Sequence, residues 1–141
     1  MSMFNRFRSK KGDAKKILIV DDEPNILRTV ADRLRMTGYE VVTAADGEEG
    51  LERALEEKPD LILLDILMPR LDGFATLDRL GQITETRDIP VIMLTARSQA
   101  EDVLRATTSG AADYVVKPFD LVALIEKIDK VLGGAKAGRP R

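Results

Sequence analysis

Five polar residues that could take part in chemistry stand at the ends of short apolar runs. The pair Asp21 and Asp22 follows the first run, Asp65 the third, Thr95 the fourth and Lys117 the fifth. Three nearby carboxylates repel one another and raise one another's pKa unless a cation lies among them. Oxygen ligands favour a hard divalent cation, so the sequence predicts a Mg²⁺ site, with Mn²⁺ as the alternative.

The remaining two residues would complete a site for a phosphoryl group. Lys117 offers an ammonium and Thr95 a hydroxyl, and both groups donate hydrogen bonds to phosphate oxygens. An aspartate can act as a nucleophile and form an aspartyl phosphate. One of the three carboxylates would then be the nucleophile.

Each of these residues also has an ordinary structural explanation when it is taken alone. An acidic pair after a strand often caps the next helix, as Asp22 could do here. Asp65 could cap a loop, and a lysine before Pro118 usually marks only a turn. The structural explanation requires a coincidence at the end of four separate runs, so we favour the chemical one.

Composition narrows the chemistry further. The chain of 141 residues contains no cysteine and no histidine. Disulfides, thiolate metal sites, cysteine nucleophiles and histidine acid–base catalysis are therefore excluded. Any reaction must use carboxylates, hydroxyls, lysine or arginine.

Five apolar runs predict the strands that would position these residues. Most are nearly continuous, which is typical of strands buried on both faces of a parallel sheet. The runs are 17–20, 41–45, 61–64, 91–94 and 114–116.

Stretches with helical spacing separate and follow these runs. Their apolar stripes are Ile26, Leu27, Val30 and Leu34; Leu51, Ala54 and Leu55; Phe74, Leu77 and Leu80; Val103, Ala106 and Thr107; and Leu121, Leu124, Ile125, Ile128 and Leu132. The alternation predicts an α/β fold, a doubly wound, five-stranded parallel sheet of order 2-1-3-4-5, flavodoxin-like (βα)5. Ligands of such sheets bind outside the carboxyl ends of the strands, where the five polar residues would meet.

The length suits one compact domain, which we expect over residues 16–132. Residues 1–15 are expected to form a basic flexible extension and residues 133–141 a flexible basic tail. We expect no effector domain after residue 132, because the nine remaining residues cannot fold alone. No run approaches the length of a membrane span, and the N-terminus lacks the apolar core of a secretory signal.

Charge is unevenly distributed. Residues 17–132 hold 13 basic and 23 acidic side chains, whereas residues 1–16 hold six basic and one acidic. An acidic body disfavours nucleic acid, so we expect no nucleic-acid partner. Phe4 and Phe7 stand among the N-terminal basic residues, so residues 1–15 could contact an anionic membrane surface, although a solvated tail is the simpler interpretation.

The sequence resembles the receiver domains of two-component response regulators over about residues 16–132. The resemblance is to the stand-alone, chemotaxis-regulator-like members. Its motifs are Ile-Leu-Ile-Val-Asp-Asp-Glu at 17–23, Leu-Ile-Leu-Leu-Asp-Ile-Leu-Met-Pro at 61–69, Asp-Gly at 72–73, Val-Ile-Met-Leu-Thr-Ala at 91–96 and Gly-Ala-Ala-Asp-Tyr-Val-Val-Lys-Pro-Phe at 110–119. These motifs are specific in combination rather than singly.

The resemblance implies a role for each residue around the metal. Asp65 would be the phosphoacceptor. Asp22 would bind the metal directly, Asp21 largely through water, and the backbone carbonyl of Leu67 would be a further ligand. Lys117 would pair with Asp65 and later with the phosphoryl group.

The resemblance also implies a switch and its partners. Thr95 and Tyr114 would be the switch pair, and the Lys117–Pro118 bond would be cis. The phosphoryl group would come from a histidine kinase or a phosphotransfer protein in the cytoplasm. Phosphorylation would change the surface of the fourth helix, fifth strand and fifth helix, which a downstream protein target would read. The chain would catalyse only its own phosphorylation and dephosphorylation.

Three alternatives remain at this point. A receiver-like module could bind partners without using phosphate. A haloacid-dehalogenase-like phosphatase also uses an aspartate nucleophile, but it would need a second Asp where Leu67 stands. A flavodoxin-like electron carrier would need a phosphate-cradling loop after the first strand, where Asp21, Asp22 and Glu23 would repel phosphate.

Overall fold

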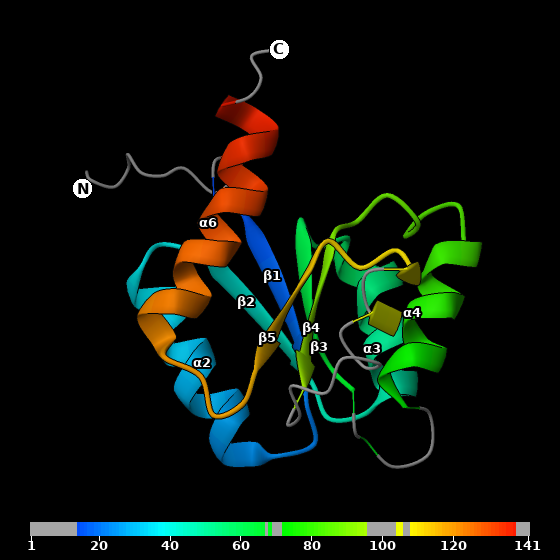
Figure 1. The fold of residues 1–141 in the computed structure, drawn as a ribbon, viewed down its shortest axis with the longest axis horizontal. Coiled ribbons are helices and arrows are strands. Elements are labelled where there is room, and N and C mark those ends of the chain that lie inside the picture. Colours follow the sequence, from blue (N-terminus) through cyan, green and yellow to red (C-terminus); the bar gives the residue numbers. More distant parts are fainter. Residues whose placement is uncertain (1–13, 67, 69–71, 96–103, 106–107, 138–141) are drawn as a thin grey trace.

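A computed structural model describes residues 14–66, 68, 72–95, 104–105 and 108–137. One parallel sheet crosses the middle of the domain, and helices cover both of its faces (Figure 1). The strands run in the order β2-β1-β3-β4-β5, which confirms the predicted doubly wound topology. The strands are β1 (Lys16–Val20), β2 (Glu40–Ala44), β3 (Leu61–Asp65), β4 (Val91–Thr95) and β5 (Asp113–Val116).

Four helices have described bounds. They are α2 (Pro24–Met36), α3 (Gly47–Glu57), α4 (Gly73–Gln82) and α6 (Leu121–Ala137). Pro24 occupies the first turn of α2, where its missing N–H costs nothing. The stripe of Val103, Ala106 and Thr107 lies outside the described residues, although Leu104, Arg105 and Thr108 beside it are helical.

Alternate residues of the central strands point into two separate cores. Leu18, Ile62 and Met93 pack with α3 and α4 on one face of the sheet. Ile19, Leu63 and Leu94 pack with α2 and α6 on the other. The two-residue period of a strand therefore explains why helices are needed on both sides.

Central and edge strands differ in burial. Every residue of β3 and β4 is buried, and β1 is buried from its second residue onward. The edge strands β2 and β5 are mostly half-buried, so the expectation of burial on both faces holds only for the centre of the sheet. On β2, the Arg35 guanidinium donates a hydrogen bond to the Val41 carbonyl at 3.2 Å.

The last helix continues beyond the domain boundary expected at residue 132. Helix α6 includes Gly133 and runs to Ala137, so part of the tail expected over 133–141 is helical. A helix already packed through Leu124, Ile128 and Leu132 can tolerate glycine, which costs about 1 kcal/mol relative to alanine. Among the described residues, no helix is long and apolar enough to cross a membrane.

Candidate functional site

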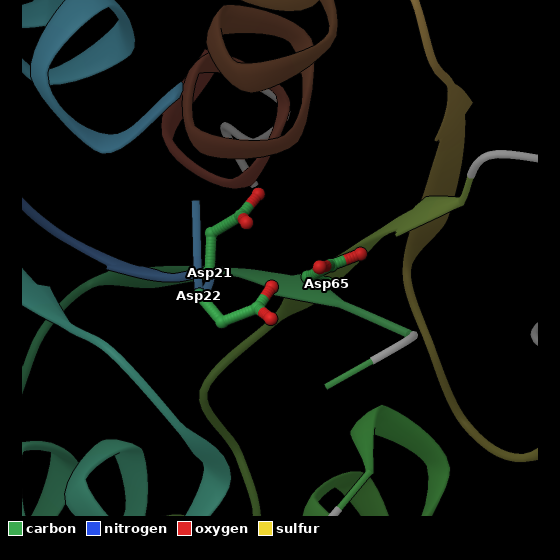
Figure 2. Close-up of side chains that lie close together, drawn as sticks. All are labelled: Asp21, Asp22 and Asp65. Carbon is green, nitrogen blue, oxygen red and sulfur yellow. The ribbon is translucent and has the colours of Figure 1, made fainter. Parts of the chain in front are cut away.

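Three carboxylates meet at the carboxyl edge of the sheet. Asp21 and Asp22 follow β1, and Asp65 is the last residue of β3. An oxygen from each lies within 4.8 Å of an oxygen from the other two. Figure 2 shows the three side chains beside one another, carried by these two neighbouring strands. The structure thus brings together the acidic cluster that the sequence predicts.

The three carboxylates differ in exposure and in their contacts. Asp21 is fully buried, and its two oxygens accept hydrogen bonds from the Glu23 backbone N–H and the Lys117 ammonium, both at 3.0 Å. Asp65 is 4% exposed, whereas Asp22 is exposed. Asp22 is not the helix cap, because Glu23 holds that position. Asp22 therefore presents a carboxylate to solvent beside two buried ones.

Lys117 connects the elements of the site. Its ammonium nitrogen lies 3.0 Å from Asp21, 3.2 Å from Glu23 and 3.4 Å from Asp65, and its side chain is 13% exposed. Burial lowers the pKa of Lys117, but the hydrogen bond to Asp21 and the charge of Asp65 outweigh burial and raise it above its ordinary value. Lys117 is therefore held protonated. The Lys117–Pro118 bond is cis, as the resemblance implies.

Thr95 and Tyr114 lie on the neighbouring strands β4 and β5. Thr95 is the last residue of β4 and is 4% exposed. Its register partner is Val116, while Tyr114 pairs with Met93, so the two side chains are two residues apart in register. Tyr114 is half-buried, with the Lys127 ammonium 5.8 Å from its ring centroid.

The start of α4 is packed against the backbone of Asp65. The Gly73 N–H donates to the Ile66 carbonyl at 2.9 Å, and the Asp72 side chain caps the helix by accepting from the Ala75 N–H. A Cβ at Gly73 would lie 2.3 Å from the Asp65 carbonyl oxygen. Since real Cβ atoms do not approach so closely, glycine is required for this contact.

The structure places most of the predicted residues together. Asp21, Asp22, Asp65 and Lys117 form one cluster, and Thr95 ends the strand beside Asp65. Tyr114 lies near the start of β5, two residues farther from this edge than Thr95, and Leu67 lies outside the described residues. Our interpretation missed Glu23 as a partner of Lys117. The signal was present, because an acidic residue two positions beyond Asp21 begins the helix at the same edge.

Comparison with known proteins defines the class. The response regulator receiver domain pattern matches residues 17–129, so the chain belongs to this family. The DNA-binding dual master transcriptional regulator RpaA of Synechocystis sp. is 44% identical over 117 residues, which are 83% of this chain and 48% of that protein. The probable transcriptional regulator ycf27 of Cyanophora paradoxa is 49% identical over 118 residues, 84% of this chain and 48% of its own.

Solved structures agree with this assignment. The chemotaxis protein CheY4 of Vibrio cholerae matches with a TM-score of 0.80 and 34% identity over 84% of this chain and 98% of its own. A CheY-like receiver domain protein from Methanospirillum hungatei matches with a TM-score of 0.82 and 32% identity over 89% and 99%. The chain spans about half the length of the curated relatives it matches.

Family membership settles the general function. Receiver domains of two-component systems are phosphorylation-dependent switches that interact with histidine kinases and bind a divalent metal at an acidic pocket. The phosphatase and electron-carrier alternatives belong to other families and find no support. The chain is therefore a signalling receiver.

Proposed function

We propose that Asp65 accepts a phosphoryl group from a phosphohistidine on a histidine kinase or phosphotransfer protein. A carboxylate oxygen of Asp65 attacks phosphorus, and the nitrogen–phosphorus bond breaks with its electron pair left on the imidazole. One observation carries this proposal. The Lys117 ammonium contacts both Asp21 and Asp65 at the edge where Asp22 faces solvent.

The donor set fits a hard divalent cation. The cluster contains only carboxylates, and its oxygens lie within 4.8 Å of one another. Such oxygens suit Mg²⁺ or Mn²⁺. Asp22 and Asp65 would hold the ion directly, Asp21 through water and the Leu67 carbonyl as a further ligand. When bound, the ion neutralises charge on the transferring phosphoryl group.

Lys117 and Thr95 would contact the phosphoryl oxygens once Asp65 carries them. The added group brings about −1.5 to −2 charge, which attracts the Lys117 ammonium and the Thr95 hydroxyl. Tyr114 would then move into the space that Thr95 leaves. This movement would change the surface formed by the fourth predicted helix, to which the helical residues Leu104, Arg105 and Thr108 belong, together with β5 and α6.

That surface would bind a downstream protein target in the cytoplasm. The printed names of some relatives describe DNA-binding regulators, and the chain covers about half of their length. The receiver portion itself is acidic, so we propose that its own partner is protein rather than nucleic acid. In this respect it would act as a stand-alone, chemotaxis-regulator-like receiver does.

Labelling with acetyl phosphate and Mg²⁺ tests the acceptor. The chain contains no histidine, so phosphohistidine cannot form on it. A phosphate that hydroxylamine removes must therefore be an acyl phosphate. We expect one added phosphoryl group by mass spectrometry, and none in Asp65→Asn. Asp60→Asn, at the opposite edge of the sheet, is the matched control and should label normally. Labelling of Asp65→Asn would refute the assignment, and no labelling of the unaltered chain would favour a module that does not use phosphate.

A further inference from the structure

Glu23 holds a position that the family chemistry does not explain. Its carboxylate lies 3.2 Å from the Lys117 ammonium and is 61% exposed. Three oxygens therefore surround the ammonium, from Glu23, Asp21 and Asp65. A lysine ammonium has three N–H donors, so these carboxylates can occupy all of them.

The Glu23 side chain does not take part in capping helix α2. Glu23 is the N-cap residue of α2, yet its side chain makes no capping hydrogen bond. Its backbone makes the local contacts instead, because its carbonyl accepts from the Leu27 N–H and its N–H donates to Asp21. The described contact of the carboxylate is with Lys117.

The three partners of Lys117 differ in how easily they can release it. Asp21 is fully buried and is also fixed by the Glu23 N–H. Asp65 is buried and is the proposed acceptor. Glu23 is the exposed partner, so water can replace the lysine at its carboxylate at little cost.

The geometry points to Glu23 as a positioning residue that occupies one N–H of Lys117 until the phosphoryl group on Asp65 takes it over. Glu23 would thus compete with the incoming group and slow phosphorylation. It would also repel an anionic donor, because its exposed carboxylate lies 3.2 Å from the ammonium that contacts Asp65. This inference rests on the proposed role of Asp65.

The test compares initial phosphorylation rates of the full chain at saturating Mg²⁺. We expect Glu23→Gln to react about two- to fivefold faster with acetyl phosphate, as the loss of one exposed ion pair allows. Beryllofluoride, a phosphoryl mimic, should bind more tightly by a similar factor. Both gains should shrink in about 1 M salt, where the Debye length is about 3 Å.

Glu48→Gln is the matched control. Glu48 is exposed in the first turn of α3, after the carboxyl end of β2, and has the same charge. This variant should leave both measurements unchanged. Equal gains in the two variants would show a general effect of charge and would refute a positioning role for Glu23. A phosphorylation rate that is unchanged or lower in Glu23→Gln would also overturn the proposal. A failure of the acceptor role would be distinct, because Asp65→Asn would then label.

Discussion

The two edges of the sheet each contain a lysine among carboxylates, but the charges are balanced differently. At the amino edge, the Lys16 ammonium pairs with Glu57 at 3.0 Å, and the Lys16 backbone N–H donates to Asp60 at 2.8 Å. At the carboxyl edge, one ammonium serves Asp21, Glu23 and Asp65, and Asp22 stands beside them.

This difference distinguishes a structural cluster from a functional one. The Lys16 and Glu57 side chains are 28% and 33% exposed, and such a pair contributes about 0–1 kcal/mol to folding. Among the described residues, the carboxyl edge instead gathers three carboxylates, Asp21 and Asp65 buried among them, around one lysine ammonium, and such a cluster favours the binding of a cation. The gathering of carboxylates, rather than any single ion pair, distinguishes the candidate site.

The largest expected effect is on metal binding. Asp21→Asn should weaken Mg²⁺ binding about tenfold, as the loss of an outer ligand typically does. Asp22→Asn should weaken it more, because we propose that Asp22 binds directly. Titration calorimetry measures both, and Asp60→Asn at the amino edge should bind Mg²⁺ normally. A larger effect for Asp21 would reverse the assigned roles.

An effect of similar size should appear in the free energy of unfolding without divalent ions. Asp65→Asn removes repulsion from two carboxylates but also loses attraction to Lys117, so we expect a net gain of about 1–2 kcal/mol. Asp60→Ala should instead destabilise the protein by about 1 kcal/mol, because the Lys16 N–H loses its acceptor. Urea unfolding in chelator measures both changes. Changes of the same sign would contradict the contrast between the edges.

The smallest effect concerns pH at the amino edge. Tyr39 lines a cleft with Lys16, and its hydroxyl donates a hydrogen bond to Asp129. Burial, with help from Asp129, raises the pKa of Tyr39 above its ordinary value of 10.0. The protonated Tyr39 hydroxyl therefore stabilises the folded state fully below about pH 10, and this contribution is lost as pH rises through the folded-state pKa.

Tyr39→Phe removes this dependence. It should lower the free energy of unfolding at pH 8 by about 1 kcal/mol or less, and the difference from the unaltered chain should shrink at alkaline pH. Urea unfolding at a series of pH values measures it. A difference that stays constant across the series would show that Tyr39 ionisation does not affect folding.

The sequence predicted the sheet because burial determines residue type most strongly at its centre. The apolar runs at 61–64 and 91–94 belong to β3 and β4, yet each strand extends one residue further, to Asp65 and Thr95. A polar residue ends an apolar run without ending the hydrogen bonding of the strand. Helix α6 likewise runs past Leu132, the last residue of its apolar stripe, to Ala137, because the backbone hydrogen bonds of a helix do not require an apolar residue in every turn.

The site was predicted as a set of strand ends, and its finer geometry was not. Strand order alone brings Asp21 and Asp65 together. The contact of Glu23 with Lys117 joins residues 94 positions apart, and it depends on side-chain direction at the start of α2. No spacing rule supplies that direction. The roles assigned to Thr95 and Tyr114 stay predictions until a phosphorylated state is measured.

The close contact of Gly73 with the backbone of Asp65 limits how such a chain can evolve. Its place is dictated by the Asp65 carbonyl oxygen, a backbone atom that every residue at position 65 would present. Glycine is therefore required by the path of the main chain and not by the reactivity of the Asp65 side chain. A descendant that lost the acceptor carboxylate and abandoned phosphate signalling would still be under selection to keep glycine there. Glycine at position 73 would then persist in a chain that no longer carries out phosphoryl transfer.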